Sequence, residues 1–419
     1  MLRVVIERNA HYAKATVREL VVKLDQNRGF GAARRAPGGP HVDDEDVALV
    51  LRQLHGAVAE EVLAGRNVIA DRFDPLQMLE LIERLEHSYS LRPRHPERES
   101  VYAGYRERSE RLRAALVQDA ASPVRSWLHG EHGLDGWRVD VANMAGRLGS
   151  VDVTREFARD VRAAMAQEGD DLLLVAEHAH DASGDLLGDG WHGTMNYAGF
   201  TRQVWCWLRG PDFHETFLGV PLEVPVITGQ QAVASWQAFH ARIPWRSLLA
   251  SWNVLSSHDT ARIRTVVGSA ERQVAALGLA IGLPGVPMVF AGDEIGATGL
   301  WGEDSRTPFP WHDRAVWDLD VLEAYRALLP VRRRSVALAT GGLRWLHVGT
   351  DAIAFVREHP DETVLVVVAR GQSEPVRLPL AAVGGGSVRS LFGFDASVVA
   401  GQVVIDVPSA GAGVWRVEE

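Results

Sequence analysis

The feature that most restricts how this chain can fold is a series of apolar, strand-like runs that each end in a carboxylate. The runs GWRVD, LLLVAE and WNVLSSHD end at Asp140, Glu177 and Asp259. Segments with helical spacing of apolar residues accompany them, at 152–167 and 270–282. Apolar strands that alternate with helices through short links predict a parallel sheet with crossover helices, hence an α/β fold.

The same alternation extends over residues 110–340, with further helices predicted at 110–129 and 314–334 and a strand at 287–292. The pattern then changes. Residues 341–419 contain short alternating runs such as AIAFVRE, TVLVVVAR and GAGVWRVEE, separated by Gly, Pro and Asp. Runs of this kind are typical of a small antiparallel β domain.

Residues 1–109 have a different composition from the rest of the chain. All 13 tryptophans lie at Trp127 or later. Helical periodicity predicts helices at 44–64 and 75–89, separated by Arg/Pro/Gly-rich pieces such as ARRAPGGP and RPRHPERES that favour loops. The sequence therefore predicts an atypical, mostly helical N-terminal segment before the α/β part.

Composition excludes several classes of protein. A net charge of −10 gives no support for a nucleic-acid partner. No apolar run reaches the roughly 18 residues that a membrane span needs, and the first residues have no signal-peptide stretch. The single cysteine, Cys206, excludes an internal disulfide framework and a cysteine zinc cluster. We therefore expect a cytoplasmic protein with no membrane partner.

Carboxylates at the C-terminal ends of parallel strands are the arrangement of a barrel active site. Two of them can break a glycosidic bond, one by attack on the anomeric carbon and the other by protonation of the leaving oxygen. Arg138 lies two residues before Asp140 on an extended strand, so both side chains share one face and the guanidinium can keep the carboxylate ionised. Glu177 follows an apolar run, and burial there would help it keep a proton.

Each of these residues also has a purely structural interpretation when taken alone. An Asp at a strand end is usually a cap or loop residue, and a single Glu177 is more often on the surface. Asp259 precedes a helical stretch and could be its N-cap. Only the joint occurrence of the three carboxylates, in order and at strand ends, favours catalysis.

At this point the motifs resemble a known family. GLDGWRVDVANM is similar to the strand-four signature of the alpha-amylase family (glycoside hydrolase family thirteen), in its neopullulanase/cyclomaltodextrinase-like branch. Residues 174–200, which include Met195-Asn196-Tyr197, resemble the strand-five segment of that branch, and NVLSSHDTARI resembles the strand-seven motif. LPGVPMVFAGDEIGATG, followed by RTPFPW ending at Trp311, resembles the strand-eight region.

The resemblance implies a (β/α)8 TIM barrel, with its N-terminal strands missing or divergent, followed by a C-terminal antiparallel β-sandwich domain at 341–419. It implies that Asp140 is the nucleophile, Glu177 the general acid/base and Asp259 a third carboxylate that stabilises the distorted sugar. The residues that it implies for substrate binding are Arg138, His258, Asn196 and Tyr197.

The implied activity is retaining hydrolysis of α-glucosidic bonds in maltodextrins or cyclodextrins through a covalent glycosyl-enzyme intermediate. Two alternatives stay open: an α-glucan transglycosylase, and a catalytically impaired remnant or maltodextrin-binding pseudoenzyme. The expected partner is an α-glucan oligosaccharide. No organic cofactor and no metal ligand set is implied, while calcium binding and oligomeric state are left undecided.

Two departures from the family pattern stand out. The branch usually has Ile-Trp after the acid/base glutamate, whereas this chain has His178-Ala179, which removes a bulky wall on the leaving-group side. The strand-three motif with its Asn-His pair is not found, and the closest stretch, GRNVIADRFDP with Asp71, lacks that pair. Either residues 1–105 rebuild the first part of the barrel with other elements, or the N-terminal region is altered.

Overall fold

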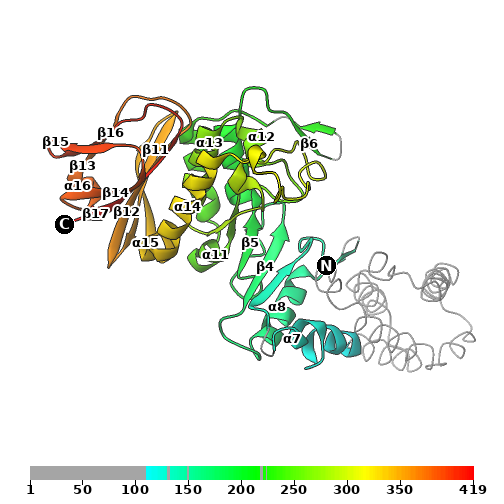
Figure 1. Cartoon of the computed structure of the whole chain (residues 1–419). Coiled ribbons are helices and arrows are strands. Elements are labelled where there is room, and N and C mark those ends of the chain that lie inside the picture. Colours follow the sequence, from blue (N-terminus) through cyan, green and yellow to red (C-terminus); the bar gives the residue numbers. More distant parts are fainter. Residues whose placement is uncertain (1–109, 130–132, 149–150, 218–219, 223) are drawn as a thin grey trace, which may run out of the picture. The chain divides into compact units, whose positions relative to one another are not determined.

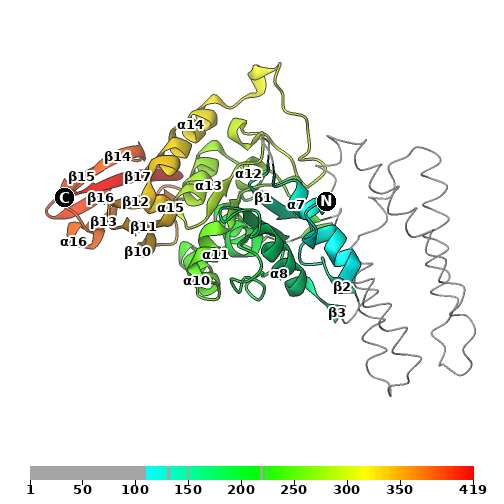
Figure 2. The same cartoon turned by 90° about the horizontal axis from the view of Figure 1, so that it is seen from below.

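The structure is a computed structural model, and it divides the chain into two compact units (Figures 1 and 2). One unit contains residues 1–114 and 145–153, and the other contains 115–144 and 154–419. The described residues are 110–129, 133–148, 151–217, 220–222 and 224–419. The helices expected at 44–64 and 75–89, and the stretch around Asp71, lie outside them. In the first unit the described residues include the hairpin of β2 (Arg147–Leu148) and β3 (Val151–Asp152).

The second unit contains a parallel sheet that, among the described residues, has five strands in the order β1-β4-β5-β8-β9. Every neighbouring pair is parallel, so the predicted α/β architecture is confirmed. The strands are β1 (Gly136–Val139), β4 (Leu173–His178), β5 (Gly193–Asn196), β8 (Trp252–Val254) and β9 (Val286–Met288). The sequence pattern does not predict β5, because Gly and Asn at its ends have low strand propensity.

Helices connect and cover these strands. Between β1 and β4 lies α8 (Thr154–Met165), and between β5 and β8 lie α9 (Arg202–Leu208), α10 (Gly229–His240), α11 (Trp245–Ala250) and the hairpin of β6 (Glu215–Phe217) and β7 (Val220–Leu222). Between β8 and β9 lie α12 (Ile263–Val267) and α13 (Ala270–Gly282). After β9 come the 3₁₀ turns Asp293–Ile295 and Arg314–Val316, and then α14 (Leu319–Arg334) and α15 (Val336–Thr340).

Two of the predicted helices are interrupted. The segment 110–129 contains a π-helical turn, Ala114–Gln118, and a separate short helix α7, Pro123–Ser126. Pro123 cannot continue the preceding helix, and Ser122 caps the new one by accepting a hydrogen bond from the Arg125 backbone N–H. The helix expected at 314–334 instead begins at Leu319, because the Asp318 side chain caps its first turn.

The predicted strands 252–257 and 287–292 are shorter in the structure, as β8 and β9. Beyond Val254 the chain leaves the sheet, and serine and threonine hydroxyls replace the ladder as hydrogen-bond partners of the backbone. Ser256 Oγ accepts a hydrogen bond from the Ile263 N–H at 2.8 Å, and the Ser257 N–H donates to Thr260 Oγ1 at 2.9 Å. These bonds build the turn that leads into α12.

Residues 341–419 form the predicted antiparallel β-sandwich. The larger sheet has the order β10-β11-β12-β17-β14 and the smaller one β13-β16-β15. The short helix α16 (Leu380–Val383) follows β13. The strands are β10 (Gly342–Val348), β11 (Ala352–His359), β12 (Glu362–Ala369), β13 (Val376–Pro379), β14 (Ser387–Gly393), β15 (Ala396–Val399), β16 (Gln402–Ile405) and β17 (Gly411–Glu418).

Strands β11 and β12 are apolar without alternation because both of their faces are buried. Val356 and Leu365 lie in the core between the two sheets, while Phe355 and Val366 lie in the core shared with the helices of the α/β part. α13 packs so closely on β17 that a Cβ added at Gly278 would lie 2.4 Å from the Ala412 Cβ. The sandwich and the helices therefore share one continuous core.

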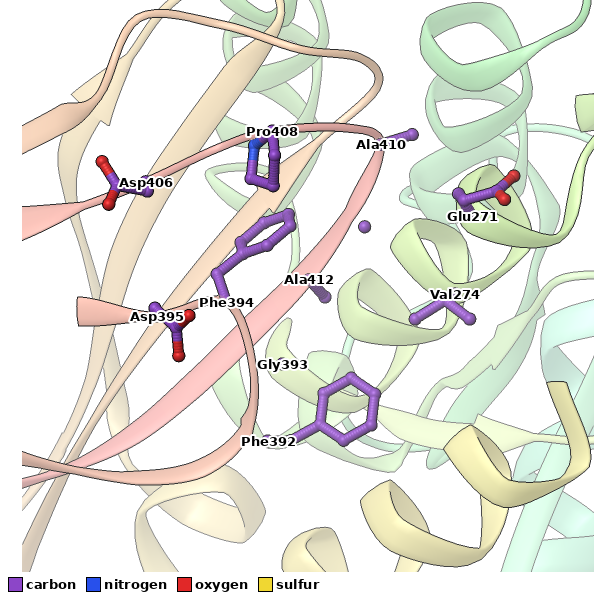
Figure 3. Close-up of a pocket in the computed structure, with 11 residues that line it drawn as sticks. Glu271, Val274, Phe392, Gly393, Phe394, Asp395, Asp406, Pro408, Ala410 and Ala412 are labelled. Atoms are coloured by element: carbon purple, nitrogen blue, oxygen red, sulfur yellow. The ribbon is translucent and has the colours of Figure 1, made fainter. Parts of the chain in front are cut away.

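A cavity of about 330 Å³ lies where the start of α13 meets the β14–β15 turn and the link between β16 and β17. Figure 3 shows the Phe394 ring beside Pro408, the Phe392 ring apart from both, and the Glu271 carboxylate on the helix side of the cavity. None of the candidate catalytic residues lines this cavity. It is a gap between packed elements and not the site that the sequence predicts.

Candidate active site

The register of the parallel strands decides which side chains can meet. The pairing aligns Arg138 with Val175 and Glu177 with Met195. Because side chains alternate between the two faces of a strand, Arg138, Glu177 and Met195 lie on the same face of the sheet. The Arg138 Nε lies 3.3 Å from the Met195 Sδ, which is the contact expected of neighbours on one face.

One guanidinium bridges two of the predicted carboxylates. The Arg138 Nη1 lies 2.6 Å from the Asp140 Oδ1, and the Arg138 Nη2 lies 2.6 Å from the Glu177 Oε1. Both carboxyl groups are thus held against the same planar cation. The structure brings together the candidate nucleophile, its arginine and the candidate acid.

The backbone after Asp140 also binds Glu177. The Val141 N–H donates to the Glu177 Oε2 at 2.6 Å, and the Ala142 N–H donates to the Glu177 carbonyl at 3.0 Å. Val141 has φ of 42°, a left-handed conformation that is costly for a β-branched residue. This strained backbone conformation directs the Val141 N–H toward the Glu177 carboxyl group.

The environment separates the pKa values of the two carboxyl groups. Burial raises the pKa of Glu177 to about 7, with the Val141 N–H opposing and the hydrogen bond to Asp140 adding to the rise. Burial alone would raise the pKa of Asp140 as well, but hydrogen bonds with Glu177 and Arg138 outweigh it and hold that pKa below its usual value. Asp140 is therefore the ionised member of the pair at neutral pH, where Glu177, with a pKa of about 7, still carries a proton in about half of the molecules.

The third carboxylate, Asp259, lies in the turn after β8 and is more exposed. The Arg306 Nη2 binds the Asp259 Oδ1 at 2.8 Å, and the Arg306 Nε donates to the His258 carbonyl at 2.7 Å. The His258 Nε2 lies 3.1 Å from the Asp259 Oδ2. Arg306 was not among the candidate site residues in the sequence. The RTPFPW motif was the only signal for it, since its role depends on a contact across 47 positions.

Tyr197 connects the two parts of the site. Its hydroxyl donates to the Ser257 Oγ at 2.8 Å, and the Ser257 Oγ accepts the Asp259 N–H at 3.2 Å. Burial raises the pKa of Tyr197 to about 12, and the negative charges of Glu177 and Asp259 add to the rise. The charges of Glu177 and Asp259 thus both act on the Tyr197 hydroxyl. The three acidic residues therefore share one region at the C-terminal ends of the strands.

The position of the Asn196 side chain follows from the register of the strands. It aligns with His178 in the register of β4 and β5, and both side chains therefore lie on the face opposite to Glu177. The Asn196 side chain is buried, and its Oδ1 accepts the Gly199 N–H at 3.0 Å. This contact caps the π-helical turn Tyr197–Thr201. In the structure Asn196 makes this supporting contact, and its expected role in substrate binding stays a prediction.

The departure at His178-Ala179 has a clear structural account. His178 is buried on the helix-facing side of β4, and its Nε2 lies 3.2 Å from the Asp185 Oδ2. The hydrogen bond from His178 is the largest cause that lowers the pKa of Asp185. Nearby, the His180 Nδ1 lies 3.2 Å from the Asn143 Nδ2, which joins the loop after β4 to the loop after β1. These contacts anchor the loop that follows Glu177.

Two further observations bear on the sequence expectations. Among the described residues no group of three or more His, Cys, Asp or Glu side chains is arranged to hold a metal ion. In the same part of the chain, no helix has the length and apolar character needed to cross a membrane.

Comparison with known proteins agrees with the fold and with the motifs. Neopullulanase 2 from Thermoactinomyces vulgaris is 32% identical over 62% of this chain and 41% of its own length. Cyclomaltodextrinase from a Bacillus species is 30% identical over 58% of this chain and 39% of its own length. The structure of a cyclic alpha-maltosyl-(1→6)-maltose hydrolase from Arthrobacter globiformis matches with a TM-score of 0.56 and 27% identity, over 75% of this chain and 60% of that one.

The matched part of the chain thus spans about two fifths of the length of these curated relatives. The solved relative and the family domain confirm the TIM-barrel class followed by an antiparallel β domain. The family model described as the alpha amylase catalytic domain matches residues 108–325, which is more than half of the chain. This chain therefore belongs to the alpha-amylase family.

Proposed function

We propose that the chain is a retaining glycoside hydrolase that acts on α-glucosidic bonds of maltodextrins or cyclodextrins. The observation that carries the proposal is the pair Asp140 and Glu177 on one guanidinium, with their pKa values moved in opposite directions. Two carboxyl groups in different protonation states at one pH are what a double displacement at an anomeric carbon requires.

In the first step the ionised Asp140 attacks the anomeric carbon while Glu177 gives its proton to the departing glycosidic oxygen. The bond from that carbon to the leaving sugar breaks, and an ester to Asp140 forms. In the second step Glu177, now ionised, takes a proton from water, and the water oxygen displaces Asp140 from the same carbon. Two inversions retain the α configuration, and Glu177 ends with its proton restored.

The remaining residues act on charge and orientation. Arg138 keeps Asp140 ionised before the attack and stabilises its carboxylate when it departs. Asp259, held by Arg306 and His258, is placed to accept hydrogen bonds from sugar hydroxyls, contacts that strengthen as the ring flattens. Tyr197, through its hydrogen bond to Ser257, supports the turn that carries Asp259.

The relatives support the substrate class. Those found include proteins named for pullulan and cyclomaltodextrin, and the Arthrobacter globiformis hydrolase has been solved in complex with maltose. A cytoplasmic location stays a prediction, based on the single cysteine, Cys206.

The test is release of glucose or maltose from γ-cyclodextrin and maltotriose by the full chain. Asp140→Asn should lower turnover by about a thousandfold or more, because the amide cannot form the ester intermediate. Asp320→Asn, an equal charge change at an exposed position in α14, should leave turnover unchanged. Turnover that survives in Asp140→Asn would contradict the assigned nucleophile. A folded wild-type chain with no turnover on either glucan would contradict the hydrolase proposal.

A further inference from the structure

An exposed aromatic cluster lies in the segment between β9 and α14. The Trp311 side chain is 69% exposed, and its ring lies against Phe309 with the centroids 4.2 Å apart. The Trp317 ring packs edge-on against the Phe309 ring, with the centroids 5.6 Å apart. Phe309 and Trp317 are half-buried beside the exposed Trp311, so the three rings form a contiguous apolar patch, and such patches mark binding sites.

The cluster is held in place before any ligand binds. The Trp317 Nε1 donates to the Pro310 carbonyl at 3.1 Å, and the Trp311 N–H donates to the Phe309 carbonyl at 2.9 Å. The Arg314 guanidinium lies over the Trp317 ring, 5.1 Å from its centroid. A ring fixed by its neighbours loses little conformational entropy on binding, which favours affinity. In Figure 2 this yellow segment before α14 projects beyond the helices around it.

The same segment is attached to the candidate active site at its other end. Arg306 binds both Asp259 and the His258 carbonyl. The preceding carbonyl, Ser305 O, accepts hydrogen bonds from the Nε and Nη2 of the buried Arg262 at 3.1 and 2.9 Å. Trp311 follows Arg306 by five residues, so its Cα lies within about 18 Å of the Arg306 Cα even in a fully extended chain. A short oligosaccharide bound at Asp259 can span that distance.

We propose that Trp311, backed by Phe309, is a stacking platform for a glucosyl ring of an α-glucan chain whose reacting unit lies at Asp140. This proposal rests on the proposed function and names a subsite for it. A pyranose has an apolar face of C–H groups and a polar rim of hydroxyls. The flat apolar face of an indole can stack on the C–H face of the sugar while the hydroxyl rim stays in water. The platform lets the protein favour longer glucans over short ones.

The prediction concerns chain-length preference. In Trp311→Ala, the preference for maltoheptaose over maltotriose should fall about five- to tenfold, the loss expected for one aromatic contact. It should appear in the dissociation constants from calorimetric titration and in kcat/KM. Trp311→Phe keeps a flat ring and should retain most of the preference. Because Trp311 is exposed, neither change should impair folding.

A matched control is Trp245→Ala. Trp245 is also exposed, at 41%, but it begins α11, whose last residue lies against Gly193 at the start of β5, the opposite end of the strands from the carboxylates. An equal preference for maltoheptaose in wild type and Trp311→Ala, or an equal loss in Trp245→Ala, would overturn the platform. Binding without turnover in the wild type would contradict the proposed hydrolysis but still test the platform, since calorimetry needs no turnover. Absence of binding by the wild type would overturn both.

Discussion

At the scale of single residues, the site holds two chemically similar side chains whose pKa values are moved in opposite directions. Asp140 and Glu177 are both carboxylic acids and both contact Arg138. They differ in burial, because the Glu177 side chain is 11% exposed at the end of an apolar strand, while the Asp140 side chain is 33% exposed. Desolvation therefore favours the neutral form of Glu177, and the shared guanidinium favours the charged form of Asp140.

This difference predicts a pH dependence. In the proposed mechanism Glu177 gives its proton to the leaving oxygen; as pH rises through about 7 it loses that proton, so kcat/KM for maltotriose should fall. At low pH, activity should fall when Asp140 is protonated, below its usual pKa. A pH profile of the wild type measures both limbs, with stability checked across the same range.

The variant Glu177→Gln tests whether Glu177 causes the fall in activity on the basic side of the pH profile. This change should lower turnover of maltotriose by about 10²- to 10⁴-fold, since a poor leaving group needs protonation. A chromogenic maltoside with a good leaving group should lose far less in its bond-breaking step, and its profile should no longer fall near pH 7. Equal losses on the two substrates, or a basic limb that persists in the variant, would contradict the acid role of Glu177.

At the scale of elements, the loops at the C-terminal ends of the strands are held by a buried ion pair. Arg262 Nη1 lies 3.0 Å from Asp293 Oδ1, and both side chains are at most 2% exposed. The same guanidinium donates to the Ala291 carbonyl at 2.9 Å and to Ser305 O. It also lies over the Phe290 ring at 3.8 Å. One side chain therefore joins the loop after β8, the loop after β9 and the segment that begins at Ser305.

The prediction for this element is a loss of stability. Arg262→Met removes one partner and leaves the Asp293 carboxylate buried without its counter-charge, which should cost about 3–5 kcal/mol in the free energy of unfolding. Urea denaturation measures this loss. The double variant Arg262→Met/Asp293→Leu removes both charges and should recover part of it. A double variant less stable than Arg262→Met would contradict this account.

At the scale of the whole molecule, the β-sandwich and the helices of the α/β part share a core. Trp236 of α10 is fully buried and stacks on Trp345 of β10 with the centroids 6.0 Å apart and the rings 5° from parallel. Phe355 of β11 packs edge-on against Trp345 at 5.2 Å. Because these aromatic residues come from both parts, loss of packing in one part should weaken the other.

Trp236→Ala tests this coupling. Removal of a buried indole should cost about 3–5 kcal/mol and leave a cavity at the junction. Thermal unfolding followed by circular dichroism should still show one transition at a lower Tm, because a shared core couples the two parts. Trp245→Ala is the control and should change stability by less than about 0.5 kcal/mol. Two separate transitions in Trp236→Ala would show that the parts unfold independently.

Sequence by itself determined much of this protein. Periodicity identified α13 at its observed bounds, 270–282, and placed β1 and β4 within a residue or two. Periodicity can do this because the residues on one face of a helix or strand recur at fixed intervals along the chain. It also placed Asp140 and Glu177 at strand ends, and the spacing between Arg138 and Asp140 placed these two side chains on one face. These are local relations that a single segment contains.

Only the tertiary structure decided the rest. Strand register moved Asn196 to the far face and brought Glu177 beside Arg138, and register is set by packing across the whole sheet. The bond between Arg306 and Asp259 joins residues 47 positions apart, a relation that no local pattern encodes. The protonation of Glu177 likewise depends on burial, which many distant side chains create together.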